Sequence, residues 1–157
     1  MKTFFSILLV IFLWGNLLFA EDSPAPMVPN HIIFGECNSV ILASSVSVNY
    51  EYVLARFISV RCGYSGGYAT VEPSHGGFGI AGGHGALAMI NLFTTKRANK
   101  LELGGGVTYT TFHRFGWQAH PAMSLSYRYQ QKDDIFFRAG LNIGVFGGLM
   151  LSVGCAF

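Results

Sequence analysis

The stretch AMSLSYRYQ, residues 122–130, gives the clearest indication of the fold, because its large apolar and its polar residues alternate one by one. The odd positions carry Met123, Leu125 and two tyrosines, whereas the even positions include two serines, Arg128 and Gln130. Successive side chains of a β-strand point to opposite faces, so a period of two predicts a strand with one apolar and one polar face.

The same alternation recurs along the chain from residue 31 onward. We expect eight strands, at residues 31–36, 43–53, 57–66, 79–93, 100–111, 118–130, 134–143 and 148–157. Regular strands with no helical period between them are typical of an all-β fold. The sequence therefore predicts a barrel of eight antiparallel strands, and transmembrane strands if the apolar face points outward.

Composition restricts the class of protein further. The chain has 157 residues, of which 51% are hydrophobic and only 11% charged, against about 25% charged in a typical soluble domain. This length predicts one domain. The formal net charge of +2 gives no basis for binding nucleic acid, so we expect no nucleic-acid partner.

The first twenty residues have the three parts of a secretory signal peptide. Lys2 provides the positive charge, residues 4–14 the apolar run, and Ala20 a small residue at the cleavage site. The alternative is an uncleaved anchor helix, although the apolar run is near the lower length limit for crossing a bilayer. The expected organisation is a signal peptide at 1–20, an extended, proline-rich periplasmic lead-in at 21–30 and the barrel at 31–157.

Two features favour an apolar face that points outward into lipid. Tyrosines such as Tyr50, Tyr109 and Tyr129 recur near strand ends, where outer-membrane barrels carry aromatic girdles. The opposite face is rich in glycine and serine, which suit a narrow lumen. We therefore expect a lumen lined by small, polar and charged side chains.

The connections are expected to differ between the two ends of the barrel. Short turns near residues 54–56, 94–99 and 131–133 would lie on the periplasmic side, together with both chain ends. Longer loops at residues 36–42, 67–78 and 112–117 would lie outside, and the short connection 144–147 is the exception.

Several segments resemble the small eight-stranded outer-membrane barrel proteins of Gram-negative bacteria, especially the uncharacterised ones common in Bacteroidetes. The segments are SVNYEY (47–52), VRCGY (60–64), KLELGGGVTY (100–109), SYRYQ (126–130), FFRAGL (136–141) and LSVGCAF (151–157). Together they span most of the chain after the leader, and Cys62 departs from the small or apolar residue expected there. The resemblance implies a barrel in the outer membrane and no particular activity. It also implies that Phe157 belongs to the signal read by the assembly machinery.

Five charged residues fall on the polar face and are the candidate site: Glu51, Arg61, Glu102, Arg128 and Arg138. In a narrow lumen they must neutralise one another, so the expectation is a structural network of salt bridges. A tight turn after residue 53 would place Glu51 and Arg61 one diagonal step apart. A proton relay or a ligand-gated plug is the alternative, since buried charges also mark transport.

No catalytic residues are expected. His120, Ser124, Ser126 and Glu102 share the polar face, which leaves a lipid acyl hydrolase or transferase as an alternative. His120 and Ser124, however, are four residues apart in one strand, about 13 Å, which is beyond hydrogen-bonding reach.

No metal or cofactor is expected either. Four histidines would gather toward the outer rim without a ligand spacing: His75, His84, His113 and His120. The glycine-rich run 76–83 lacks the lysine and the helix of a phosphate-binding loop. An odd number of cysteines, Cys37, Cys62 and Cys155, leaves at least one thiol free or paired between chains.

These observations favour a structural or surface-interaction barrel without catalytic activity, located in the outer membrane. Its expected partners are outer-membrane lipid, lipopolysaccharide and the assembly machinery. A narrow conduit for small or hydrophobic molecules is the first alternative, and a lipid-modifying enzyme is the second.

Overall fold

The computed structural model describes residues 30–40, 43–55, 57–71, 79–94, 98–112, 115–130 and 135–157. All the regular elements in these ranges are β-strands. None of these residues belongs to a helix long and apolar enough to cross a membrane. The expected signal peptide, and the lead-in up to residue 29, lie outside the described residues.

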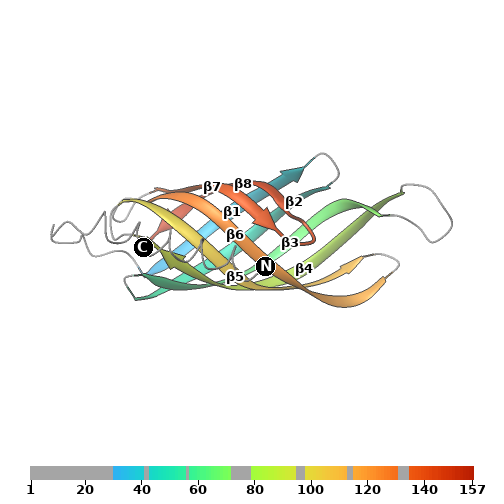
Figure 1. Cartoon of the computed structure of the whole chain (residues 1–157), viewed down its shortest axis with the longest axis horizontal. Helices are drawn as coiled ribbons and strands as arrows, with labels where there is room; N and C mark the ends of the chain where they lie inside the picture. The colour runs from blue at the N-terminus through green and yellow to red at the C-terminus, as the bar shows by residue number, and fades with distance from the viewer. Residues whose placement is uncertain are drawn as a thin grey trace, which may run out of the picture.

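The strands form a closed antiparallel barrel in which each strand pairs with its neighbours in chain order and β8 pairs with β1 (Figure 1). The strands are β1 His31–Val40, β2 Ala43–Ala55, β3 Ile58–Val71, β4 Gly79–Phe93, β5 Asn99–Phe112, β6 Phe115–Gln130, β7 Ile135–Ile143 and β8 Gly148–Ala156. The predicted all-β fold with eight antiparallel strands is therefore confirmed.

Backbone pairing between the first and last strands closes the barrel. The pairs run from Ile32 opposite Ala156 to Ser39 opposite Leu149. Beyond them, the His31 amide donates to the Phe157 carbonyl at 3.1 Å, and the Phe157 amide donates to the His31 carbonyl at 2.9 Å. The start of β1 and the end of β8 thus lie at one end of the barrel, as the even strand count predicts. We call this the terminal end and the opposite one the far end.

The register fixes how wide the barrel is. Following paired residues once around the barrel from Gln130 returns to β6 at His120, a shear of ten positions. The path runs through Gln130, Phe136, Gly154, Phe34, Asn49, Gly63, Leu87, Thr108 and His120. Eight strands tilted by about 40° enclose a space that side chains can fill, or that can hold one small ligand.

Along the strands most of the large apolar side chains face outward, as the alternation predicts. In β8, Leu149, Leu151 and Val153 are exposed, whereas Met150 and Ser152 between them are buried. The same arrangement holds in β6, the strand that contains the stretch 122–130.

The far end differs from the prediction, because the expected loops 36–42 and 112–117 are mostly strand. β1 continues to Val40 and β6 begins at Phe115, so each connection shrinks to two residues. Asn38 remains paired with Ser45 in the ladder and faces inward. Polar side chains are the ordinary lining of this lumen, so their appearance does not end the strand.

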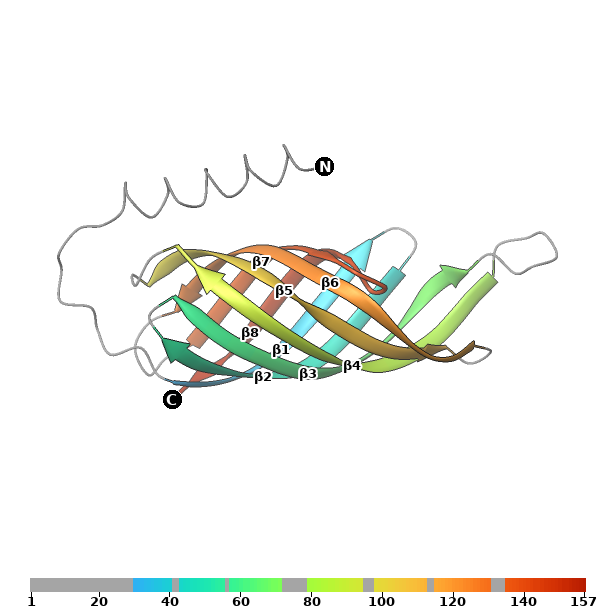
Figure 2. The same ribbon diagram turned by 60° about the horizontal axis from the view of Figure 1, so that its bottom comes forward.

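The four longest strands, β3 to β6, form most of the far end. β3 to β6 have 14 to 16 residues each, whereas β1, β7 and β8 have 10, 9 and 9. Figure 2 shows the far parts of β3–β6 extending well beyond the other strands. We call this extension the protruding wall.

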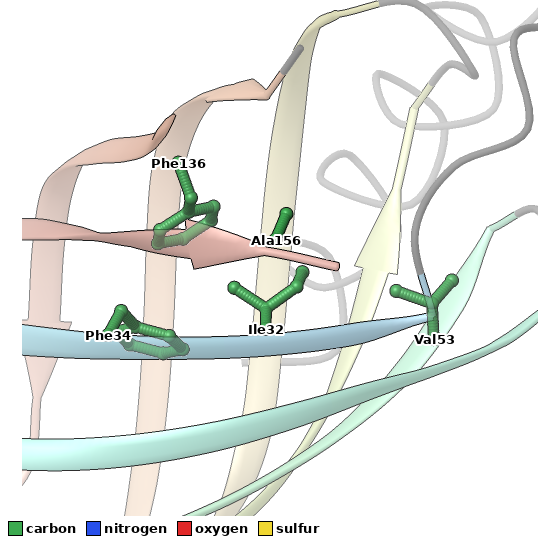
Figure 3. Packing of buried hydrophobic residues seen from close by; sticks show 5 residues of the cluster. All are labelled: Ile32, Phe34, Val53, Phe136 and Ala156. Carbon is green, nitrogen blue, oxygen red and sulfur yellow. The ribbon is translucent and has the colours of Figure 1, made fainter. Parts of the chain in front are cut away.

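The lumen at the terminal end is apolar, which corrects the expectation of a lining that is small, polar or charged throughout. A buried cluster of Ile32, Phe34, Val53, Phe136 and Ala156 fills it (Figure 3). The rings of Phe34 and Phe136 lie 4.9 Å apart between centroids. Neighbours such as Ile33 and Phe137 are also apolar but face outward, so hydrophobicity alone does not reveal which of them lines the lumen.

Candidate functional site

A layer of charged side chains crosses the lumen next to this apolar cluster. It comprises Glu36, Glu51, Arg61, Lys100, Glu102, Arg128 and Arg138, all of them buried. These are all the aspartate, glutamate, lysine and arginine residues in the described ranges. The described outer surface therefore carries none of these four residue types.

Arg138 of β7 connects strands on opposite sides of the lumen. Its Nη1 lies 2.5 Å from Oε1 of Glu102 on β5, and its Nη2 lies 2.9 Å from Oε2 of Glu36 on β1. Ser152 of β8 donates to the same Glu36 oxygen at 2.9 Å. A single guanidinium thus links strands that are far apart in the sequence.

Arg128 of β6 holds the other side of the layer. Its Nη1 lies 2.5 Å from Glu51 and 3.0 Å from Glu102. Its Nε and Nη2 donate to the Gln130 side-chain oxygen at 3.1 and 2.6 Å. Glu102 therefore receives both Arg128 and Arg138 and is the central carboxylate of the layer.

The pairing of Arg61 differs from the one expected. Arg61 lies directly opposite Glu51 in the β2–β3 register, not one diagonal step away. Its Nη2 contacts Glu36 at 2.7 Å, and its Nε donates to the Asn49 side-chain oxygen at 3.1 Å. Glu51 pairs instead with Arg128, across the lumen.

Glu36 and Lys100 are members of the layer that the sequence analysis did not identify. Glu36 was assigned to the first loop, yet it bridges Arg61 and Arg138. The only indication in the sequence that Glu36 faces the lumen is its even position, two residues after Phe34. That signal is masked because β1 carries isoleucine on both faces, at positions 32 and 33.

Phenylalanine rings at the terminal side pack against the arginines. The guanidinium carbon of Arg128 lies 4.7 Å from the ring centroids of both Phe93 and Phe136. Arg138 lies 4.5 Å from the Phe34 ring, and Arg61 lies 5.2 Å from the same ring. Such cation–π contacts gain strength when they are removed from water, so the apolar cluster also supports the charges.

The charges of the layer nearly cancel. Three arginines balance three glutamates, and Lys100 adds one positive charge, with its Nζ 4.7 Å from the Phe93 ring centroid. Ion pairs buried this deeply offset their desolvation cost only when the geometry is good and further hydrogen bonds are made. Most charged atoms of the layer meet this condition, whereas Glu51 Oε2 and Arg61 Nη1 have no hydrogen-bonding partner among the described residues. The residues of the layer come from six strands.

The residues considered for catalysis do not form a triad. Glu102 is opposite Ser126 in the register, but its carboxylate is bound by two arginines. His120 lies opposite Thr108, four residues along β6 from Ser124.

The histidines and cysteines considered above are dispersed. His84 points outward, where its Nδ1 lies 2.5 Å from the Tyr64 hydroxyl, whereas His120 is on the inward row of β6. His75 and His113 lie outside the described residues. The three cysteines are free and all face outward: Cys37, Cys62 and Cys155.

Comparison of the chain with protein-family models, with curated proteins and with solved structures finds no match. The geometry of the barrel is therefore the basis for the function proposed below.

Proposed function

We propose that the mature protein is an outer-membrane β-barrel of a Gram-negative bacterium that acts through its surface and not through catalysis or transport. The distribution of charge carries this proposal: in the described ranges every aspartate, glutamate, lysine and arginine side chain faces the lumen, and the large side chains of the outer face are mainly apolar. An apolar surface of this extent is unfavourable in water. A bilayer would cover it.

The height of the apolar face suits a membrane. The outward row of β6 runs from Trp117 to Tyr129, with Met123 and Leu125 exposed between them. Twelve positions span about 40 Å along a strand and about 30 Å along an axis tilted by about 40°. Outer-membrane barrels carry an apolar band of about 25 Å between two aromatic girdles, and Trp117 and Tyr129 fit those two positions.

The sequence supports the location independently. A signal peptide at residues 1–20 would deliver the chain to the periplasm, and the terminal Phe157 resembles an assembly signal. With the terminal end on the periplasmic side, the tip of the protruding wall beyond Trp117 would lie outside the cell among lipopolysaccharide, the expected lipid partner of the protein.

Two structural features favour surface interaction over a conduit. The charged layer and the apolar cluster fill the lumen in series. The protruding wall also has a free edge, since residues 115–122 of β6 pair with β5 but, within the described strands, have no partner on β7. The end of this edge beyond Trp117 would reach the outer membrane surface. An unpaired edge can accept a strand from another protein.

Reconstitution tests this assignment against its two alternatives. Purified mature protein in liposomes should neither admit small solutes nor release fatty acids from phospholipid or lipopolysaccharide. Solute uptake would favour the conduit, and deacylation would favour the enzyme. Fractionation with N-terminal sequencing should find the protein in outer membranes starting at or near Glu21. Recovery in the inner membrane with Met1 retained would overturn the proposed location.

A further inference from the structure

A small chamber lies in the far half of the lumen. Its volume is about 30 Å³, enough for about two water molecules. Glu36 of the charged layer contributes to its lining, together with Asn38, Ser47, Thr108 and Phe146. The chamber thus borders the charged layer on one side and the β7–β8 turn on another.

The β7–β8 turn, residues 144–147, lines the far side of this chamber and leaves it partly open to solvent. Phe146 in the turn is buried, with 7% of its surface exposed. Its ring centroid lies 5.6 Å from that of Phe112, at the end of β5. Because β7 and β8 are short, the turn reaches across the mouth to the protruding wall, and Phe146 acts as a lid.

Glycines fix the shape of both partners. Gly148 has a φ of 144°, which side chains rarely adopt. A Cβ at Gly147 would lie 2.7 Å from the Asn142 carbonyl oxygen. A Cβ at Gly83 would lie 2.7 Å from the Phe112 ring, so the absence of a side chain at Gly83 leaves room for this ring. The closed lid is therefore a defined conformation, with glycines at its ends where it can turn.

Polar groups in the far half of the lumen indicate water. Thr110 Oγ1, Ser124 Oγ and Asn142 Oδ1 are buried and have no hydrogen-bonding partner among the described residues. Buried polar atoms are nearly always satisfied, by water where protein groups are out of reach. Of these three residues Asn142 lines the chamber, together with the side chains of Asn38, Ser47 and Thr108, so the chamber provides space for water at Asn142.

From these observations we infer that the lumen has two constrictions in series, the charged layer and the Phe146 lid, with a hydrated chamber between them. Movement of the β7–β8 turn widens the opening of the chamber on the far side alone, because the charged layer still separates it from the terminal end. The inference is independent of the membrane location and goes beyond the proposed surface role, since it gives the barrel a gated pocket at its far mouth.

Thiol accessibility tests this inference on full-length mature protein folded in detergent. The native cysteines are replaced by alanine, and a single cysteine is placed in the chamber by Ser47→Cys. Its reaction with a small, charged methanethiosulfonate should be slow, and Phe146→Ala should accelerate it at least about tenfold. Tenfold corresponds to about 1.4 kcal/mol, less than the usual cost of removing a buried phenylalanine ring.

Three controls keep the result interpretable. Leu149→Ala, next to the turn but facing outward, should leave the Ser47→Cys rate unchanged. Ser59→Cys, buried in the part of β3 nearer the terminal end, should stay unreactive in the Phe146→Ala background. Gly148→Ala strains the turn without removing the ring, and it should also raise the Ser47→Cys reaction rate. This variant replaces Phe146→Ala in the test if Phe146→Ala fails to fold.

Two results would overturn the inference. Equal Ser47→Cys rates with and without the Phe146 ring would show that the turn is not a lid. A Ser59→Cys thiol that became reactive together with the chamber thiol would show that the charged layer is not a separate constriction.

Discussion

Replacing Arg138 with leucine should destabilise the barrel strongly. The substitution removes contacts to Glu36 and Glu102 and the packing of the guanidinium against the Phe34 ring. Leucine cannot neutralise either carboxylate, and both carboxylates are buried. Glu36 keeps Arg61 and Glu102 keeps Arg128, so each carboxylate loses one of its two arginines.

The expected magnitude follows from the burial of the whole group. Breaking a buried ion pair by removing one partner costs about 3–5 kcal/mol. With an unfolding slope of about 2 kcal/mol per molar urea, a loss of about 4 kcal/mol lowers the midpoint by about 2 M. Lys132→Leu removes the same charge from the connection between β6 and β7 and should move the midpoint by less than about 0.3 M, because changes away from buried networks usually stay within about 0.5 kcal/mol.

Urea unfolding of the refolded protein in detergent measures this directly. In protein made without residues 1–20, and so without Trp14, Trp117 is the only tryptophan and reports unfolding by its fluorescence. A cycle of Arg138→Leu with Glu102→Gln should show a coupling of about 1–3 kcal/mol, because the two groups are in contact. Equal midpoints for Arg138→Leu and Lys132→Leu, or strict additivity in the cycle, would refute a stabilising charged layer.

Two further predictions concern residues at the seam and in the layer. Deleting Phe157 should lower the yield of folded barrel while export continues, because it removes both backbone bonds to His31 and a ring contact at 5.9 Å. Heat-modifiable gel migration measures the yield of folded barrel. Phe157→Leu should retain more folded protein than the deletion. A wild-type yield of folded protein after the deletion would contradict this prediction. Glu36→Gln should lower the urea midpoint about as much as Glu102→Gln, since each carboxylate holds two arginines, and a neutral result would exclude Glu36 from the layer.

The strands could be predicted wherever large apolar and small polar residues alternate. β6 and β8 are clear cases, with Leu125 and Leu151 outward and Ser126 and Ser152 inward. The far end could not be predicted as well, because β1 continues past Glu36 to Val40 through residues that resemble a polar loop. In a barrel with a polar lumen, polarity does not distinguish a loop from the inward row of a strand.

The candidate site could be predicted in its members more than in its contacts. The five expected residues, Glu51, Arg61, Glu102, Arg128 and Arg138, all lie in the buried layer. Their partners depend on the shear of the barrel, which determines which side chains contact one another across the lumen. The shear cannot be read from any single hairpin. Arg128 reaches Glu51 from four strands away, and no local spacing indicates that contact.

Planar-bilayer recording measures whether this barrel inserts into a membrane with a closed lumen. The unmodified protein, its insertion verified by protease protection, should pass no steady current. A folded variant with Glu51→Ala and Glu102→Ala leaves four buried cations facing one carboxylate, so any current that it passes should be carried by small anions. Large, stable single-channel currents from the unmodified protein would contradict the account and favour a conduit.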